Sequence, residues 1–406
     1  MKESDTTRKW LICAGCTLLL FISGGMVVNT FTVFIPYIIK EYGLTNSEAA
    51  LITTIRCASS MLFTPLNEKY YRRLNAKRGT AVAVLLCVTS FTISAISRRK
   101  LGFYLAAVVA GAGYALGGMV AATIILDRWF ATNKGKTMGI VSAGTAMAAI
   151  ILPAPVTAII EKFGISLAFF SEAIFALALG IVIFVLLSEE YPSDVPERKA
   201  EEHFTEKQMS GTEKLPGGYL PAVLTAMFFV GAIGSCSAAN IAAHFTLFGY
   251  GSYIIASAIS LYGFTLLAAK FLFGTLADRY TTSRISYIFF TPMILSTVMC
   301  VFAFEKSNVL LIVSQILMGI GYSMFTVGIP LWAEDFSLPG NHAVTVQRYQ
   351  FLYYLGGLIC SPLPGIIADI TGEYTGAYVL FSAMGIAIAV IIWLTYRKIY
   401  ITEENI

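Results

Sequence analysis

Long apolar runs separated by short polar segments dominate the chain. A helix needs about 20 apolar residues to cross a hydrocarbon core about 30 Å thick. Twelve runs of about that length follow one another, and we predict a membrane-spanning helix in each. These runs cover residues 10–38, 47–67, 79–97, 101–126, 137–161, 166–188, 219–247, 252–276, 284–304, 308–333, 344–369 and 375–396. The pattern therefore predicts an all-α integral membrane protein with twelve transmembrane helices.

One long hydrophilic stretch, residues 189–218, divides the twelve runs into two sets of six. It is rich in charged residues, Pro and Gly and shows no hydrophobic period, which is typical of a flexible linker. We therefore expect an N-terminal six-helix bundle at 1–188, a cytoplasmic linker at 189–218 and a C-terminal six-helix bundle at 219–406.

The two halves also repeat each other in sequence. FTPLNEKY at 63–70 is matched by FGTLADRY at 273–280, and GAGY at 111–114 is matched by GIGY at 319–322. Pro153-x-Pro155 is matched by Pro362-x-Pro364, and the three offsets agree within two residues. Two parallel repeats of six helices are typical of transporters whose substrate site lies between the halves near the bilayer midplane.

Composition agrees with a membrane location. Apolar residues make up 57% of the chain and charged residues 13%, against about 45–50% and about 25% in soluble domains. The first apolar run is far longer than a signal-peptide core and lacks a cleavage site of small residues, so we expect it to stay attached as a spanning helix.

Lys and Arg are distributed unequally between the polar segments. With both termini in the cytoplasm, the inner segments hold 19 of them and the outer segments hold 6. The positive-inside rule then fixes this orientation, with Arg98, Arg99 and Lys100 as a local exception. The net charge of +4 thus reflects topology and not a nucleic-acid surface, and the short loops favour a bacterial cytoplasmic membrane.

The chain lacks the residue patterns of an enzyme. No Ser-His-Asp set, metal-ligand cluster or phosphate loop stands at a plausible depth, and seven scattered cysteines do not form a disulfide framework. Glycines at 111, 113, 117, 118, 319 and 321 allow helix backbones to approach closely. We therefore expect no catalytic residue, no metal and no cofactor.

A short signature follows the eighth predicted helix. Gly274, Asp278, Arg279 and Arg284 resemble the G-x-x-x-D-R-x(4)-R signature of the major facilitator superfamily. The first half has Pro65 and Glu68-Lys69 at the matching positions. The resemblance implies two pseudo-symmetric six-helix halves and a role for these loop residues, Glu68 included, in conformational change.

A second motif is more specific. RWFATNKGKTMGIVSAGTAMAAIILP, which begins at Arg128, is similar to a stretch found in the monocarboxylate transporters and the oxalate/formate antiporters of that superfamily. PLPGIIADITGEY at 362–374 resembles the end of helix 11 in the same group. The resemblance implies transport of a small organic carboxylate, and we assign Arg128 to the group of gating residues.

Lys270 interrupts the apolar run 266–280, about 12 Å along a helix axis from Asp278. A charge at the centre of a spanning helix costs about 2.5–3.5 kcal/mol, so it needs a use or a partner. The sequence offers no mid-membrane acid in the fifth, seventh, eighth or eleventh helix. In monocarboxylate transporters the resembling position holds an arginine that binds the substrate carboxylate. We therefore expect Lys270 to bind a carboxylate, with a salt bridge to a neighbouring helix as the alternative.

Arg56 stands near the middle of the second run, on a stripe of polar residues with helical spacing: Thr53, Cys57, Ser60, Thr64 and Asn67. Such a stripe faces a cavity or another helix, not lipid. The resemblance places the second helix beside the eleventh, so we expect Arg56 to meet Tyr349, Tyr353 or Tyr354. Its role is a gating contact, a second anion ligand or a structural pairing. Arg348 is expected to snorkel or to join the cytoplasmic gate.

Other polar residues within the runs are weaker candidates. Tyr114, Tyr322, Asn29 and Asn240 are expected to hydrogen-bond the ligand from helices around the cavity. Tyr353 and Tyr354 are assigned to the substrate site as well. Glu172 and His244 are the acid and the histidine within spans, and each is either a proton-coupling group or a structural one.

The whole pattern predicts a monomeric secondary transporter that moves a small organic carboxylate, a monocarboxylate in the first place, by alternating access across the cytoplasmic membrane. Proton-coupled relatives have an aspartate one turn before the helix 8 cation, where this chain has Leu266, so we favour exchange and keep proton symport open. The alternatives are efflux of amphiphilic compounds, for which 28 Phe and 21 Tyr are available, and a carboxylate sensor that does not transport.

Overall fold

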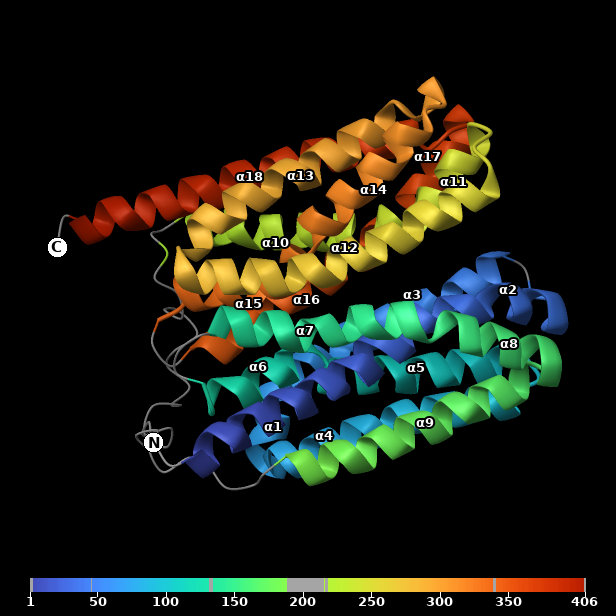
Figure 1. The fold of residues 1–406 in the computed structure, drawn as a ribbon, viewed down its shortest axis with the longest axis horizontal. Helices are drawn as coiled ribbons and strands as arrows, with labels where there is room; N and C mark the ends of the chain where they lie inside the picture. Colours follow the sequence, from blue (N-terminus) through green and yellow to red (C-terminus); the bar gives the residue numbers. More distant parts are fainter. Residues whose placement is uncertain are drawn as a thin grey trace. The chain divides into compact units, whose positions relative to one another are not determined.

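The computed structural model describes residues 3–44, 46–130, 134–187, 215, 218–338 and 341–404. The predicted linker at 189–218 lies almost entirely outside these residues. The chain divides into two compact units, Met1–Phe204 and Thr205–Ile406. Within each unit the described chain is built from helices that run along the bundle, many of them broken into consecutive pieces (Figure 1).

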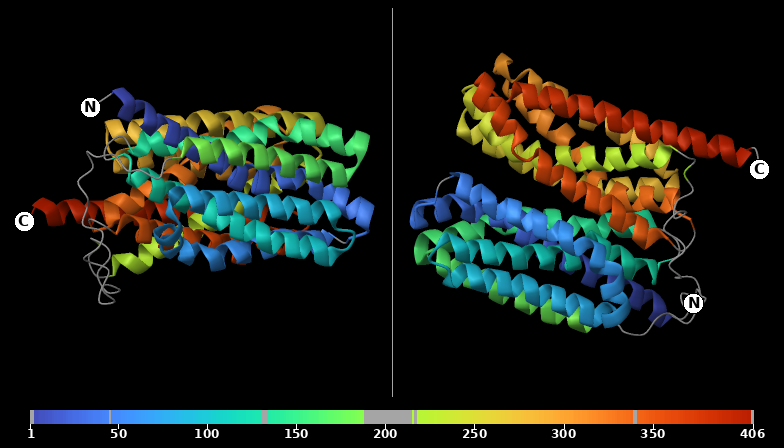
Figure 2. Two further views of the ribbon diagram at one scale, coloured as in Figure 1. Left: turned by 90° about the horizontal axis from the view of Figure 1, so that it is seen from below. Right: turned by 180° about the vertical axis from the view of Figure 1, so that it is seen from behind.

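The first unit contains six spans made from eleven helical pieces. They are α1 Glu3–Leu20, the π-helix η1 Phe21–Thr30, α2 Phe31–Tyr42, α3 Asn46–Phe63, the 3₁₀ turn η2 Thr64–Leu66, α4 Asn67–Ile96, α5 Lys100–Gly117, α6 Met119–Asp127, α7 Lys134–Ile151, α8 Pro153–Phe163 and α9 Ile165–Leu186. Helices α4 and α9 lie side by side along one face of this unit (Figure 2).

The second unit repeats the same arrangement of six spans. Its pieces are α10 Tyr219–Cys236, the 3₁₀ turn η4 Ala238–Asn240, α11 Ile241–Leu247, α12 Ser252–Arg279, α13 Thr282–Val301, the 3₁₀ turn η5 Ala303–Glu305, α14 Asn308–Tyr322, α15 Met324–Phe336, α16 His342–Cys360, α17 Leu363–Thr371 and α18 Thr375–Glu404.

Eleven helical runs among the described residues are long and apolar enough to span a membrane. The difference from the twelve predicted lies in one run, Leu51–Ile96, which contains the second and third predicted helices together. The polar segment between them is itself mostly helical, with a break at Asn75, where φ is 60°. The prediction of an all-α membrane fold is confirmed, and the two helices differ from the prediction only in how they are joined.

The breaks in the spans fall at matching places in the two units. The fourth span breaks between α5 and α6 in the first unit and between α14 and α15 in the second. The fifth span breaks just before Pro153 in the first unit and at Pro362 in the second. A proline inside a helix removes a backbone hydrogen bond and clashes with the preceding turn. The repeated prolines therefore place the same kink in both units.

Two glycines at matching positions bring helices into close contact. A Cβ atom at Gly111 would lie 2.6 Å from Cβ of Ser59, so α5 packs directly on α3. A Cβ atom at Gly319 would lie 2.7 Å from the carbonyl oxygen of Tyr262, so α14 packs directly on α12. Small residues have this role in membrane helices because they let two backbones approach. The structure thus explains GAGY and GIGY as packing elements.

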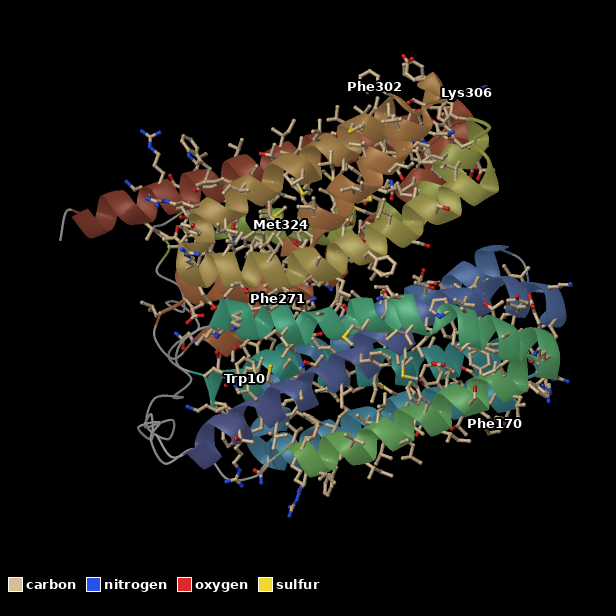
Figure 3. The ribbon with its side chains drawn as sticks, in the orientation of Figure 1. Trp10, Phe170, Phe271, Phe302, Lys306 and Met324 are labelled. Carbon is tan, nitrogen blue, oxygen red and sulfur yellow. The ribbon has the colours of Figure 1, made fainter. Side chains whose placement is uncertain are left out.

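Apolar side chains project outward from both units. Phe170 on α9 and Phe302 at the end of α13 point away from their bundles (Figure 3). Ile174 and Val185 are also exposed on α9. In a soluble protein a large exposed apolar surface marks an interface. On helices long enough to span a membrane, we interpret it as the surface that contacts lipid.

The basic exception at residues 98–100 has a local structural use. The guanidinium of Arg98 donates to Oγ of Ser166 at 2.7 Å, and Nζ of Lys100 pairs with Oε1 of Glu48 at 2.7 Å. These contacts connect the end of α4 and the start of α5 to the starts of α9 and α3.

Candidate functional site

Lys270 is buried on α12, with 2% of its surface exposed. Its neighbours Ala269 and Phe273 are buried as well, whereas Phe271 and Leu272 are exposed. Helix α12 therefore has a buried face that carries the lysine and an opposite apolar face. Asp278 lies eight residues further on, or about 12 Å along the helix axis. The structure thus holds a cation well inside a spanning helix.

Arg56 on α3 is the second buried cation, with 7% of its surface exposed. Its Nη1 donates to the carbonyl oxygen of Val27 in η1 at 2.8 Å. The side chain also lines a small cavity inside the first unit. The expected contacts of Arg56 with Tyr349, Tyr353 or Tyr354 stay a prediction, because those residues belong to the other unit.

The part of the polar stripe from Ser60 to Asn67, which runs from α3 through η2 to the start of α4, faces another helix. Oγ of Ser60 donates to the carbonyl oxygen of Gly111 at 3.0 Å, and Nδ2 of Asn67 donates to that of Ala115 at 3.0 Å. Thr64, between them, donates to the carbonyl oxygen of Ser60. This part of the stripe therefore connects α3 to α5 and does not face a cavity.

Tyr322 belongs to a buried hydrogen-bonded group in the second unit. Its hydroxyl and Oγ of Ser237 lie 2.5 Å apart, and the hydroxyl of Tyr378 donates to the carbonyl oxygen of Ser237 at 2.9 Å. Ser237 lies where α10 ends and η4 begins. The two tyrosines therefore supply hydrogen bonds at a break in the seventh span.

The other three ligand candidates lie in different settings. Asn29 is exposed, and its Nδ2 donates to the carbonyl oxygen of Thr145 on α7 at 3.1 Å. Asn240 is half-buried, and its Nδ2 donates to the carbonyl oxygen of Cys236 at 2.7 Å. Tyr114 is half-buried on α5. The Asn29 contact thus joins η1 to α7, and the Asn240 contact lies across the break between α10 and η4.

Tyr353 and Tyr354 lie on α16, with ring centroids 5.8 Å apart in an edge-to-face arrangement. Tyr354 is buried and Tyr353 is half-buried. The backbone of Tyr353 packs against Gly231 on α10. Arg348, about one helical turn earlier, is half-buried, and its expected snorkelling or gating role stays a prediction.

The signature residues flank the turn between α12 and α13: Gly274, Asp278 and Arg279 lie in the last two turns of α12, and Arg284 lies in the first turn of α13. Gly274 is buried, whereas Asp278, Arg279 and Arg284 are exposed at the helix ends. The backbone N–H of Arg284 donates to Oγ1 of Thr281, which caps α13. In the first unit, Glu68 is half-buried in the first turn of α4, and Arg128 is half-buried just after α6.

Glu172 and His244 are both buried. The Oε2 atom of Glu172 has no hydrogen-bond partner within the described part of the chain. Nε2 of His244 lies 2.8 Å from the carbonyl oxygen of Cys300, and its ring lies 4.5 Å from that of Tyr378. His244 therefore connects α11 to α13 and α18, while Glu172 has a setting in which the charged form is disfavoured.

Two of these contacts use residues that the sequence did not single out. Ser237 and Tyr378 join Tyr322 and His244 into one polar group within the second unit. The sequence separations are 85 and 141 residues, so no local pattern indicates these contacts. Among the described residues no group of His, Cys, Asp and Glu could hold a metal ion.

Spanning helices, a structural repeat and buried charges within spans define a multi-pass membrane protein of the transporter class. The chain belongs to the major facilitator superfamily, whose family model matches residues 16–258 and 223–405. This superfamily is one of membrane transporters and not of enzymes.

Curated relatives include monocarboxylate transporters. Monocarboxylate transporter 12 of Rattus norvegicus is 23% identical over 406 residues, covering 91% of this chain and 82% of that protein. Monocarboxylate transporter 11 of Homo sapiens is 23% identical over 402 residues, covering 92% and 80%. The MFS-type transporter hasB of Aspergillus fumigatus is 30% identical over 233 residues, covering 52% of this chain and 49% of that transporter.

Solved structures share the fold. The proton:xylose symporter XylE, bound to 6-bromo-6-deoxy-D-glucose, superposes with a TM-score of 0.75 at 12% identity, covering 96% of each chain. The transporter FucP in its outward conformation gives a TM-score of 0.72 at 15% identity, covering 95% of this chain and 98% of that one. These likenesses confirm the predicted fold and carry no statement about substrate.

Proposed function

We propose that this protein is a secondary transporter of a small organic carboxylate, a monocarboxylate in the first place, that works by alternating access in the cytoplasmic membrane with both termini inside. The observation that carries the proposal is the buried lysine on α12, Lys270. An ammonium group within a spanning helix is a favourable counter-charge for a carboxylate, since electrostatic attraction is much stronger there than in water.

The chemistry of Lys270 also indicates how many carboxylate groups the substrate carries. A charge-assisted hydrogen bond to a carboxylate is about twice as strong as a neutral one. An ammonium group is a point charge without the bidentate fork of arginine. A single such group suits one carboxylate better than two, which favours a monocarboxylate. The curated monocarboxylate transporter relatives support the same substrate class.

Coupling by exchange agrees with the sequence better than proton symport. Leu266 stands one turn before Lys270, at the position where an aspartate is expected in proton-coupled relatives. Exchange needs only that the loaded and unloaded carrier differ in their freedom to interconvert. We keep Glu172 and His244 as the candidate proton carriers in case uptake follows a pH gradient.

The test uses purified protein in liposomes. Entry of labelled acetate, formate, lactate, pyruvate and oxalate is measured with and without an internal carboxylate and an imposed pH gradient. We expect uptake of a monocarboxylate that requires internal carboxylate. Lys270→Gln is expected to lower this uptake by about 100-fold, because a charged partner of a buried anion is lost, while Lys270→Arg keeps part of it.

Lys306→Gln is the matched control. Lys306 is an exposed lysine of the same unit, after the turn η5 (Figure 3). We expect this variant to transport at the wild-type rate. Normal uptake by a folded Lys270→Gln variant contradicts the assignment of Lys270, and absence of carboxylate uptake by the wild type contradicts the proposed substrate class.

A further inference from the structure

A small cavity lies inside the first unit, beside Arg56. It has a volume of about 10 Å³, which is about the space that one water-sized particle needs. Its walls come from η1, α2, α3, α4 and α5, and they include Val27, Ser90, Ser94 and three alanines of α5. The cavity therefore belongs to this unit alone and is too small for a carboxylate of several carbon atoms.

The guanidinium of Arg56 has hydrogen-bonding capacity to spare at this cavity. Arginine has five N–H donors, and within the described residues Arg56 uses one atom, Nη1, in a hydrogen bond to Val27. The side chain is more than nine-tenths buried. The other N–H groups of this guanidinium can therefore donate to an occupant of the cavity that Arg56 lines.

Charge selects the kind of occupant. Guanidinium groups stay protonated in proteins, and no acidic residue lines the cavity. A buried charge without a counter-charge is strongly unfavourable. An anion supplies both a hydrogen-bond acceptor and the opposite charge, whereas a water molecule supplies only the acceptor.

The two serines are compatible with an anion. Oγ of Ser90 donates to the carbonyl oxygen of Cys87 at 2.7 Å, and Oγ of Ser94 donates to that of Ser90 at 2.9 Å. Either hydroxyl can rotate and donate into the cavity instead. The lost hydrogen bond within the helix is a smaller cost than an uncompensated guanidinium charge.

We propose that the cavity beside Arg56 is a binding site for a monatomic anion of the size of chloride, separate from the substrate site at Lys270. The anion pairs with the guanidinium and joins α3 to α4 through Ser90 and Ser94. The site does not depend on the proposed substrate, because its lining residues and its charge lie within the first unit. It makes the stability of the protein depend on halide.

The test compares purified full-length protein in chloride and in gluconate at equal ionic strength. Gluconate is too large for the cavity. We expect the wild type to melt about 2–4 °C higher in chloride, since a ligand that binds only the folded state stabilises it. Arg56→Gln is expected to lose this shift, while Lys270→Gln and the surface control Arg98→Gln keep it.

Crystals soaked in bromide give a second measurement. We expect an anomalous difference peak next to the guanidinium of Arg56 in the wild type, and this result decides the question even if Arg56→Gln does not fold. A halide shift that disappears in Lys270→Gln would place the anion at Lys270 and overturn the proposal. Equal melting in both salts, with no bromide peak, would leave a water molecule in the cavity and also overturn it.

Discussion

The second span of the first unit and the second span of the second unit pack in the same way within their units and carry different charges. Helix α3 packs closely on α5 at Gly111, and α12 packs closely on α14 at Gly319. The repeat aligns residue 63 with residue 273 in sequence. In the same alignment Ser60 corresponds to Lys270, and Arg56 corresponds to Leu266. Among the described residues each unit thus has one buried cation, and the two positions differ by one helical turn along the corresponding helices α3 and α12.

This difference separates what the fold requires from what the activity requires. The glycines and prolines recur because both units need the same close contacts and the same kinks. The cations do not recur, so the shared helix arrangement does not need them. Arg56 and Lys270 are therefore specific to their own units, and changes at them should affect activity or ligand binding more than folding.

The largest effect is expected when Lys270 in the second unit is replaced by serine, the residue at the aligned position 60 of the first unit. Lys270→Ser is expected to lower carboxylate uptake by about 100-fold, because the charged ligand is lost from a buried site. Uptake in proteoliposomes is measured together with a thermal melt. The thermal melt shows whether the variant is folded, so that a loss of uptake is not a loss of fold. A folded variant with unchanged uptake would show that the second unit's cation does not serve transport.

Substitution of the paired glycines Gly111 and Gly319 should lower folding stability, and by a similar amount in both units. Gly319→Val and Gly111→Val each force side-chain atoms into a neighbouring backbone, which is expected to cost about 3 kcal/mol or more of folding stability. Gly365→Val is the control, since nothing lies within 4 Å of a Cβ atom there. The yield of monodisperse protein is the measurement. Tolerance of valine at 111 alone would mean that the two contacts are not equivalent.

The acidic residues of the two signature copies, Asp278 and Glu68, should differ in their effect on turnover by a smaller amount. Asp278→Asn is expected to lower turnover by about tenfold, a change of about 1.4 kcal/mol in the barrier. Glu68→Gln, in the less complete copy of the signature, should lower turnover by about twofold. Both rates come from exchange assays at saturating substrate. A larger effect at Glu68 than at Asp278 would reverse the order that the two signatures indicate.

Glu172 should give the smallest effect. Its carboxyl group is buried and its Oε2 atom lacks a partner within the described residues, so an uncharged amide of the same shape fits the site. Glu172→Gln is expected to change exchange by less than about twofold, because burial already disfavours the charged form. Proton-driven uptake is measured alongside. Its selective loss would identify Glu172 as a proton carrier.

The overall fold could be predicted from the sequence because the features that determine it are local and periodic. Apolar runs of spanning length, the repeated glycines and the repeated prolines each state a physical requirement that the structure meets. The joining of α3 and α4 was missed because the polar segment between them lies outside the apolar pattern, and a helix there depends on its neighbours and not on hydropathy.

The site was less accessible to sequence reasoning for a different reason. Lys270 and Arg56 stand out as charges in apolar runs, so they could be named. The partner of Arg56 is a backbone carbonyl at Val27, and every residue has a carbonyl, so no side chain indicates it. The contact between Ser237 and Tyr322 joins two spans that are far apart in the chain, which a local pattern does not reveal.

The π-helix η1 has a consequence for how experiments on the first span are designed. Its hydrogen bonds run from i to i+5, so each turn takes up more residues than an α-helical turn. Over Phe21–Thr30, a helical wheel drawn at 3.6 residues per turn loses its phase. Beyond Thr30 such a wheel assigns lipid-facing and bundle-facing positions to the wrong residues. Scanning mutagenesis of this span therefore has to be interpreted separately before Phe21 and after Thr30.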